Sequence, residues 1–195
     1  MKQIVLIRSG SAKINKHGLD GEEVILRFSV TGDVLGALGL FSCGRNCTTV
    51  QVFRPCQALV WDAPVFRALV EHSQVLHQNL VRILARDLLE LEDRFREIAT
   101  EKVGPRVARQ VVRLIGQIGR PVDGEVEIGI SREELAQMTG TTLFTISRLF
   151  SAWETQGIVK PRREAVRVCD VASLRALFEQ SQPCAAVTEY RAAAR

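Results

Sequence analysis

The 195-residue sequence predicts an α+β protein with an N-terminal β domain, a long central helix and a C-terminal helical domain. Short runs rich in β-branched residues, separated by glycines, fill the first 62 residues. No glycine or proline occurs from Val75 to Glu101. Beyond residue 130, two amphipathic segments flank a Thr-Gly pair and a short basic hairpin pattern follows them. We therefore expect boundaries at 1–72, 73–104 and 105–180, with a flexible tail at 181–195.

Composition and charge limit the class of protein. Hydrophobic residues make up 46% of the chain and charged residues 25%, so a folded core can form. The net charge of +4 leans toward a polyanionic partner, whose contact surface would be local. No apolar run approaches the ~20 residues of a membrane span, and no secretory signal is visible. We expect a cytoplasmic protein without membrane contact, whose five cysteines are thiols or ligands.

The N-terminal segment predicts a small barrel or roll. Strand-like runs are "QIVLIRSGSAKI", "EEVILRFSV", "TTVQVF" and "CQALVW". Between the second and third runs, Gly32, Gly36 and Gly39 crowd a predicted loop. Many short strands punctuated by glycine are typical of a closed or rolled sheet.

The central segment predicts one helix over residues 75–101 with a heptad seam. Apolar residues recur with 3-4-3-4-3 spacing, and Arg and Glu flank them. A helix packed only on its own domain is one interpretation, but the pattern favours a two-chain coiled coil and hence a homodimer. The seam consists of Val81, Leu84, Leu88, Leu91, Phe95 and Ile98.

The C-terminal segment predicts a helix pair followed by a hairpin. Pro105 is expected to start a helix, and a loop at 119–124 and a short strand "VEIGI" follow it. "SREE" at 131–134 is a capping box that opens the next helix. Gly140 can adopt the positive φ of a tight turn before the second helix, which Thr142 starts. Residues 157–170 then form a hairpin with a basic tip, and 171–180 a last short helix.

A helix-turn-helix followed by such a hairpin predicts a DNA-reading unit, whose second helix enters the major groove. Arg148 can bind guanine, a contact worth about 1–3 kcal/mol against a wrong base. Ser147 can hydrogen-bond a base edge, and Phe144 can pack on a thymine methyl. Alternatively, the Phe144 ring turns back against the first helix or the hairpin. The predicted base-reading residues are Leu143, Phe144, Ser147 and Arg148, and the predicted phosphate contacts are Ser131, Arg132, Thr142, Thr145, Lys160, Arg162 and Arg163.

From Ile4 to about Leu177 the chain resembles the Crp/Fnr family of bacterial transcription regulators. The stretches that carry the resemblance are "GDVLGALGLF", the heptad helix, "SREELAQMTGTTLFTISRLFSAWETQGIV" and the hairpin. "TISRL" is similar to the branch that contains the oxygen sensor FNR. The resemblance implies a cyclic-nucleotide-binding-like β-roll, a dimerisation helix and a winged helix-turn-helix. It also implies a homodimer that activates or represses from a palindromic operator with half-sites about one helical turn apart. An activator would in addition contact RNA polymerase.

Three departures from the family pattern affect its predicted function. The family usually has several strands before the one near Ile4, so we expect either a chain that begins late or an abbreviated roll. The family often has a glutamate at the position of Phe144, so its consensus operator does not transfer. Members that bind cyclic AMP carry "GELG" and an Arg-Ser pair, whereas this chain has Ala37 and Cys47-Thr48. We therefore predict that cyclic AMP is not the signal. The corresponding effector pocket would comprise Gly36, Ala37, Leu38, Gly39, Cys47 and Thr48.

The effector itself stays open at this stage. Cys43, Cys47 and Cys56 could ligate an iron–sulfur cluster or a metal, but their spacing matches no ligand motif, and idle thiols are the alternative. Haem is another family ligand, and the three histidines could equally be packed or solvated. No nucleophile–base pair, HExxH or P-loop is present, so we expect no enzyme. The remaining alternative is a sensor that acts through protein contacts and carries a vestigial DNA-binding domain.

Overall fold

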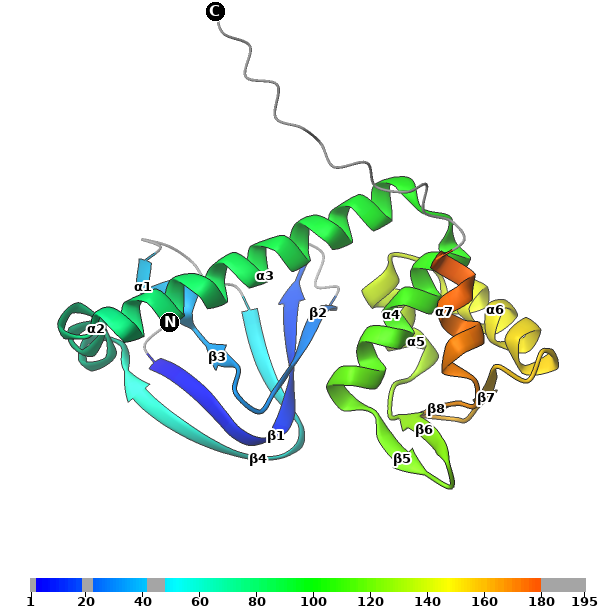
Figure 1. Cartoon of the computed structure of the whole chain (residues 1–195), viewed down its shortest axis with the longest axis horizontal. Helices are drawn as coiled ribbons and strands as arrows, with labels where there is room; N and C mark the ends of the chain where they lie inside the picture. Colours follow the sequence, from blue (N-terminus) through cyan, green and yellow to red (C-terminus); the bar gives the residue numbers. More distant parts are fainter. Residues whose placement is uncertain (1–2, 19–22, 42–47, 180–195) are drawn as a thin grey trace, which may run out of the picture.

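The computed structural model describes residues 3–18, 23–41 and 48–179. An N-terminal β-roll and a C-terminal domain lie side by side, and the long helix α3 (Gln74–Thr100) runs from one to the other (Figure 1). This arrangement confirms the predicted α+β class with a cyclic-nucleotide-binding-like roll, a long helix and a winged helix-turn-helix.

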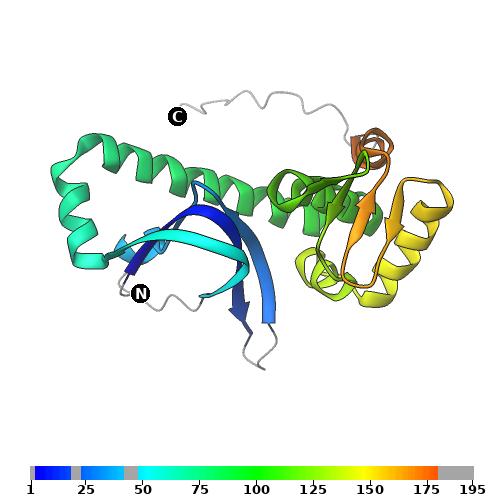
Figure 2. The same cartoon turned by 90° about the horizontal axis from the view of Figure 1, so that it is seen from below.

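The roll is a bent antiparallel sheet centred on its first strand. β1 (Gln3–His17) pairs with β2 (Glu23–Val30), with β3 (Val34–Leu35) and with β4 (Thr48–Asp62). The register of β1 with β4 shifts several times between Ile7 and Ala12. Gly10 has a φ of 86°, and a Cβ there would lie 2.1 Å from the Pro55 carbonyl oxygen. This close approach requires glycine, and the irregular register there is that of β-bulges, which bend strands. Figure 2 shows the resulting curve of β1 and β4 beneath α3.

Two predictions for the roll were wrong in detail. Residues 48–53 and 56–61 belong to one 15-residue strand, because the irregular pairing with β1 accommodates Pro55 without ending the strand. The predicted glycine loop contains a short helix, α1 (Ala37–Phe41). Ala37 is 4% exposed and packs in a cluster with Ile4 and Phe66, so tertiary burial stabilises a turn that glycine-rich local sequence disfavours.

Helices α2 (Ala63–His72) and α3 complete the N-terminal half. Ser73 caps α3, since its hydroxyl accepts a hydrogen bond from the Leu76 amide at 3.3 Å. Leu80 is buried on α3, and Leu84 is partly buried against the same apolar cluster. The other five residues of the predicted heptad seam are between 51% and 73% exposed: Val81, Leu88, Leu91, Phe95 and Ile98.

The C-terminal domain places helices on a small sheet. Its helices are α4 (Val103–Ile118), α5 (Arg132–Thr139), α6 (Leu143–Thr155) and α7 (Val171–Glu179). Its strands are β5 (Arg120–Val122), β6 (Glu125–Ile128), β7 (Val159–Pro161) and β8 (Val166–Val168), in the order β5-β6-β8-β7. Helix α4 begins two residues before the predicted Pro105. The predicted loop at 119–124 instead contains β5 and a tight turn at Asp123 and Gly124, both with positive φ.

The two domains share one apolar core. Ile25 and Phe28 of β2 are buried in the cluster that contains Val107, Ile128 and Leu135 of the C-terminal domain. Phe53 of β4 packs against the same cluster, and its ring lies edge-on to the Phe28 ring at 5.0 Å between centroids. Because rings from two strands of the roll enter this cluster, their burial stabilises the contact with the C-terminal domain. The roll therefore holds the C-terminal domain through a packed interface.

Candidate nucleic-acid interface

The helix-turn-helix forms as its sequence predicts. The Ser131 hydroxyl accepts from the Glu134 amide at 3.1 Å, and the Ser131 amide donates to the Glu134 carboxylate at 2.8 Å. Gly140 ends α5 in the left-handed conformation, with φ 58° and ψ 45°. Thr142 caps α6 by accepting from the Thr145 amide at 3.2 Å. These three local interactions fix where each helix begins and how the chain turns between them.

The two faces of α6 have opposite properties. Ile146, Phe150 and Trp153 are at most 5% exposed and anchor the helix in the core. On the other face, Leu143 is 52% exposed and Phe144 is 76% exposed. The Phe144 ring therefore does not pack against the first helix or the hairpin, which removes that alternative for the free chain.

Polar groups on the outward face of α6 are available to a ligand. Arg148 is exposed and has no ion-pair or hydrogen-bond partner in the described part of the chain. Ser147 is half-buried beside it. The hydroxyls of Thr142 and Thr145 lie 3.0 Å apart at the start of the helix. An apolar ring, an unpaired guanidinium and hydroxyls thus share one accessible surface.

The wing, which is the hairpin of β7 and β8, carries cations of two kinds. Arg162 and Arg163 at its turn are exposed, and neither side chain has a partner among the described residues. Lys160 instead donates to the Glu125 carboxylate at 2.5 Å, a bond that raises the pKa of Lys160. Arg132, at the start of α5, has a buried Nε with no hydrogen-bond partner. Of the three predicted wing cations, Arg162 and Arg163 are therefore available to bind phosphate, whereas Lys160 must first break its hydrogen bond with Glu125.

Glu134 links the DNA-reading unit to the roll. One carboxylate oxygen completes the capping box, and the other accepts a hydrogen bond from Lys13 of β1. Burial works to raise the pKa of Glu134, and the hydrogen bonds from Lys13 and Ser131 outweigh it, so that the pKa lies below its ordinary value. The Lys13 ammonium also lies 5.2 Å from the centre of the Phe53 ring. Sequence reasoning missed this pair because its members are 121 residues apart.

The predicted effector pocket is only partly described. Gly39 donates to the Gly36 carbonyl at 2.9 Å, Ala37 is buried and Leu38 is 60% exposed. Thr48 begins β4, and Cys47 lies outside the described residues. Charged groups join the roll to α3: Arg27 pairs with Asp87 at 3.2 Å and with Asp33 at 3.8 Å, and Arg86 pairs with Asp33 at 3.4 Å.

Of the three candidate cysteine ligands, the structure describes only Cys56. The Cys56 thiol donates to the carbonyls of Ser11 and Arg54 at 3.2 and 3.0 Å, while Cys43 and Cys47 lie outside the described residues. Within residues 3–18, 23–41 and 48–179, no group of three His, Cys, Asp or Glu side chains could hold a metal ion.

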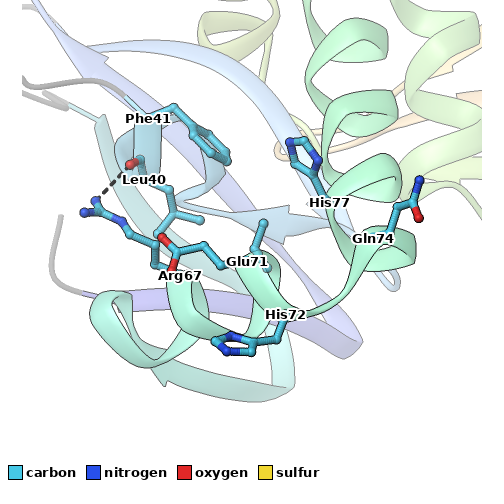
Figure 3. A pocket seen from close by; sticks show the side chains of 8 residues that line it. Leu40, Phe41, Arg67, Glu71, His72, Gln74 and His77 are labelled. Atoms are coloured by element: carbon cyan, nitrogen blue, oxygen red, sulfur yellow. Dashed lines mark hydrogen bonds between the residues drawn. The ribbon is translucent and has the colours of Figure 1, made fainter.

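A cavity of about 670 Å³ lies among α1, α2 and the start of α3 (Figure 3). Arg67 donates to the Leu40 carbonyl at 3.0 Å, and Phe41 and His77 line the same space. Helices α1 and α2, which line the cavity, lie at the end of the roll far from α6 (Figure 1). Sequence reasoning did not find it, because its walls come from three helices that no motif connects.

None of the helices in the described ranges is long and apolar enough to cross a membrane. The architecture and the exposed face of α6 define a regulator with a cyclic-nucleotide-binding-like N-terminal domain and a helix-turn-helix DNA-binding domain.

Comparisons with known proteins agree with this class. Residues 1–73 match the cyclic nucleotide-binding domain, and residues 105–177 match the Crp-like helix-turn-helix domain. The chain is 24% identical over 170 residues to the CRP-like cAMP-activated global transcriptional regulator of Mycobacterium tuberculosis, covering 86% of this chain and 76% of that protein.

Solved structures show the same fold. A CRP/FNR-family transcriptional regulator from Thermus thermophilus superposes with a TM-score of 0.78 at 18% identity, over 91% of this chain and 88% of that one. The c-di-GMP responsive global regulator CLP of Xanthomonas campestris gives 0.72 at 20% identity, over 87% and 85%. The chain belongs to the Crp/Fnr family, a family of transcription regulators and not of enzymes.

Proposed function

We propose that this regulator binds a palindromic operator as a homodimer and responds to a signal other than cyclic AMP. The observation that carries the proposal is the outward face of α6, where Phe144 is 76% exposed beside the unpaired Arg148. A large ring held in water costs free energy unless a partner covers it, and a DNA groove supplies both apolar methyl groups and hydrogen-bond acceptors.

The proposed roles follow from the chemistry of each side chain. Arg148 binds guanine through its planar fork of donors, and Ser147 hydrogen-bonds a neighbouring base edge. Phe144, with Leu143 beside it, covers a thymine methyl. Because these contacts discriminate between bases, they carry the sequence preference. The proposed phosphate contacts, which fix the register of the duplex, are Ser131, Arg132, Thr142, Thr145, Lys160, Arg162 and Arg163.

The exposed seam of α3 supports the homodimer. Its five exposed apolar residues recur at heptad spacing, and long charged side chains such as Arg82 and Glu92 flank them. Two copies that pack these seams together would bury the apolar residues and leave the charges in water. We propose residues 81–98 as the dimer interface, in which Leu84 faces both the partner and its own roll.

Two observations support a signal other than cyclic AMP. Ala37 stands where cyclic-AMP-binding relatives carry a carboxylate, and it is buried against Ile4 and Phe66, so its side chain offers nothing to a ribose. The two arginines that join the roll to α3 are already paired: Arg27 with Asp33 and Asp87, and Arg86 with Asp33. A cyclic phosphate would have to displace a carboxylate to reach them.

Selection of duplexes from a random library tests the proposal. We expect a two-fold symmetric site whose half-sites lie about one helical turn apart, bound with a steep dependence on salt because phosphate contacts release counterions. Added cyclic AMP should change neither the motif nor the affinity. An asymmetric motif would contradict the dimer, and no enrichment at all would favour a sensor that acts through protein contacts.

A further inference from the structure

Arg106 of α4 joins the end of the dimerisation helix to the turn of the helix-turn-helix. Its side chain is only 8% exposed. Nε donates to the Thr139 carbonyl at 2.9 Å, at the end of α5. Nη1 donates to the carbonyls of Ile98 and Glu101 at 3.3 and 3.2 Å, at the end of α3. One guanidinium therefore connects two helix ends that are about 40 residues apart in the sequence.

The chemistry of these ends explains why an arginine lies there. The last carbonyls of a helix have no amide partner within the helix and carry partial negative charge. A guanidinium offers several donors in one rigid plane, so it can satisfy two helix ends at once. Arg106 lies in the first turn of α4, where a cation opposes that helix's own dipole, and no carboxylate pairs with it in the described ranges. Its position thus serves α3 and α5 and does not stabilise α4.

The neighbouring charged residues make a different connection. Glu97 is 3% exposed; it accepts a hydrogen bond from Arg113 at 2.8 Å and forms an ion pair with the Arg109 Nε at 3.5 Å, and both contacts tie α3 to α4. Arg109 also donates to the Glu101 carboxylate at 3.1 Å and stacks on Phe178 of α7, 4.4 Å from the ring centre. Of these three arginines of α4, Arg106 is the one whose guanidinium reaches α5. Its acceptor Thr139 directly precedes Gly140 and the turn into α6.

We infer that Arg106 is a positioning residue: it determines which spacing between two half-sites the dimer binds. The inference rests on the proposed function, because the dimer seam on α3 defines the axis between the two copies of α6. If the turn before α6 is fixed to the end of α3, the separation of the two recognition helices is fixed as well. Loss of the clamp would leave each reading face intact and let the two faces vary in separation.

The test compares Arg106→Gln with the matched control Arg109→Gln, which removes a cation of α4 that does not reach α5. Each protein is offered operators built from the wild type's selected half-site, with spacers shortened or lengthened by one to three base pairs. We expect wild type and Arg109→Gln to prefer one spacer strongly. For Arg106→Gln we expect that preference to fall about ten-fold, as loss of the one charged hydrogen bond that reaches α5 would give. Affinity for an isolated half-site should be unchanged.

A second measurement needs no DNA. Endoproteinase Lys-C cleaves after the exposed Lys102, in the link between α3 and α4, and we expect several-fold faster cleavage there in Arg106→Gln than in Arg113→Gln, which removes an α4 cation that binds Glu97 within α3. If Arg106→Gln does not fold, Arg106→Lys replaces it in the spacer experiment, because an ammonium keeps the charge but loses the planar fork. A spacer preference as sharp as wild type would overturn the inference. If wild type selects no symmetric site, the proposed function fails, and equal Lys-C cleavage rates would then overturn the clamp as well.

Discussion

The proposed contact between Phe144 and a thymine methyl makes a prediction that can be isolated chemically. Replacing thymine by deoxyuridine removes one methyl group from the major groove and leaves base pairing intact. Covering a methyl-sized group is worth about 0.8 kcal/mol, which corresponds to about four-fold in affinity. With one such contact in each half-site, substitution in both halves should weaken wild-type binding about fifteen-fold.

Competition binding on the selected operator, with each thymine replaced in turn, locates the contact. In Phe144→Ala, uridine substitution at that position should have no effect, because the ring that senses the methyl is gone. In Phe144→Glu we expect the preference at that base pair to shift toward cytosine, whose N4 amine donates to a carboxylate. An equal loss from uridine substitution in wild type and Phe144→Ala would refute thymine reading by the ring.

Stability measurements separate this role from a structural one. Because Phe144 is 76% exposed, Phe144→Ala should change the free energy of unfolding by no more than about 0.5 kcal/mol. Phe150 is on the same helix and 2% exposed, so Phe150→Ala should cost about 3–5 kcal/mol. Urea unfolding of both variants supplies the comparison, and a large loss in Phe144→Ala would show that the ring supports the fold.

The other predictions concern the dimer, base reading and acid stability. Leu88→Asp together with Leu91→Asp should convert the dimer to a monomer in sedimentation equilibrium, whereas Leu89→Asp, which is equally exposed but off the seam, should not; a double variant that stays dimeric would place the seam elsewhere. Arg148→Ala should abolish preference for the selected operator over random duplex, and unchanged discrimination would remove Arg148 from base reading. Since the folded pKa of Glu134 lies below the ordinary value of 4.5, its stabilisation is present above pH 4.5 and disappears as the pH falls through the folded pKa. The gap in unfolding free energy between wild type and Glu134→Gln should therefore close on acidification, and a constant gap would contradict this linkage.

Sequence patterns predicted the features that depend on near neighbours in the chain. The capping box at Ser131, the left-handed Gly140 and the inward stripe of α6 all follow from contacts within a few residues. The turn at Asp123 and Gly124 was also readable, since Asp-Gly is a strong signal for a two-residue hairpin, but the flanking strands are only three or four residues long.

The remaining features depend on contacts between distant segments. Ala37 lies in a helix because the roll's core buries it, which overrides the glycines around it. Nothing near Lys13 or Glu134 in the sequence indicates that they pair, and nothing near Arg106 indicates its three carbonyl acceptors. The sequence also could not decide whether the Phe144 ring points outward or packs against the first helix or the hairpin, because either direction suits an amphipathic helix of this length.

Two polar anchors hold the helix-turn-helix at α5, in addition to the apolar interface with the roll, and both act before α6 begins. Lys13 of the roll pairs with Glu134 of α5, while Arg106 ties the end of α5 to α3. Neither anchor touches the outward face that carries Phe144. A change in the roll that acts through these two anchors therefore moves the helix-turn-helix as a body. We expect Lys13→Gln to change affinity for every operator variant by the same factor and to leave base preference unaltered. Binding to a panel of single-base operator variants would measure both quantities, and a preference that changed from one base to another would show that the roll reshapes the reading face itself.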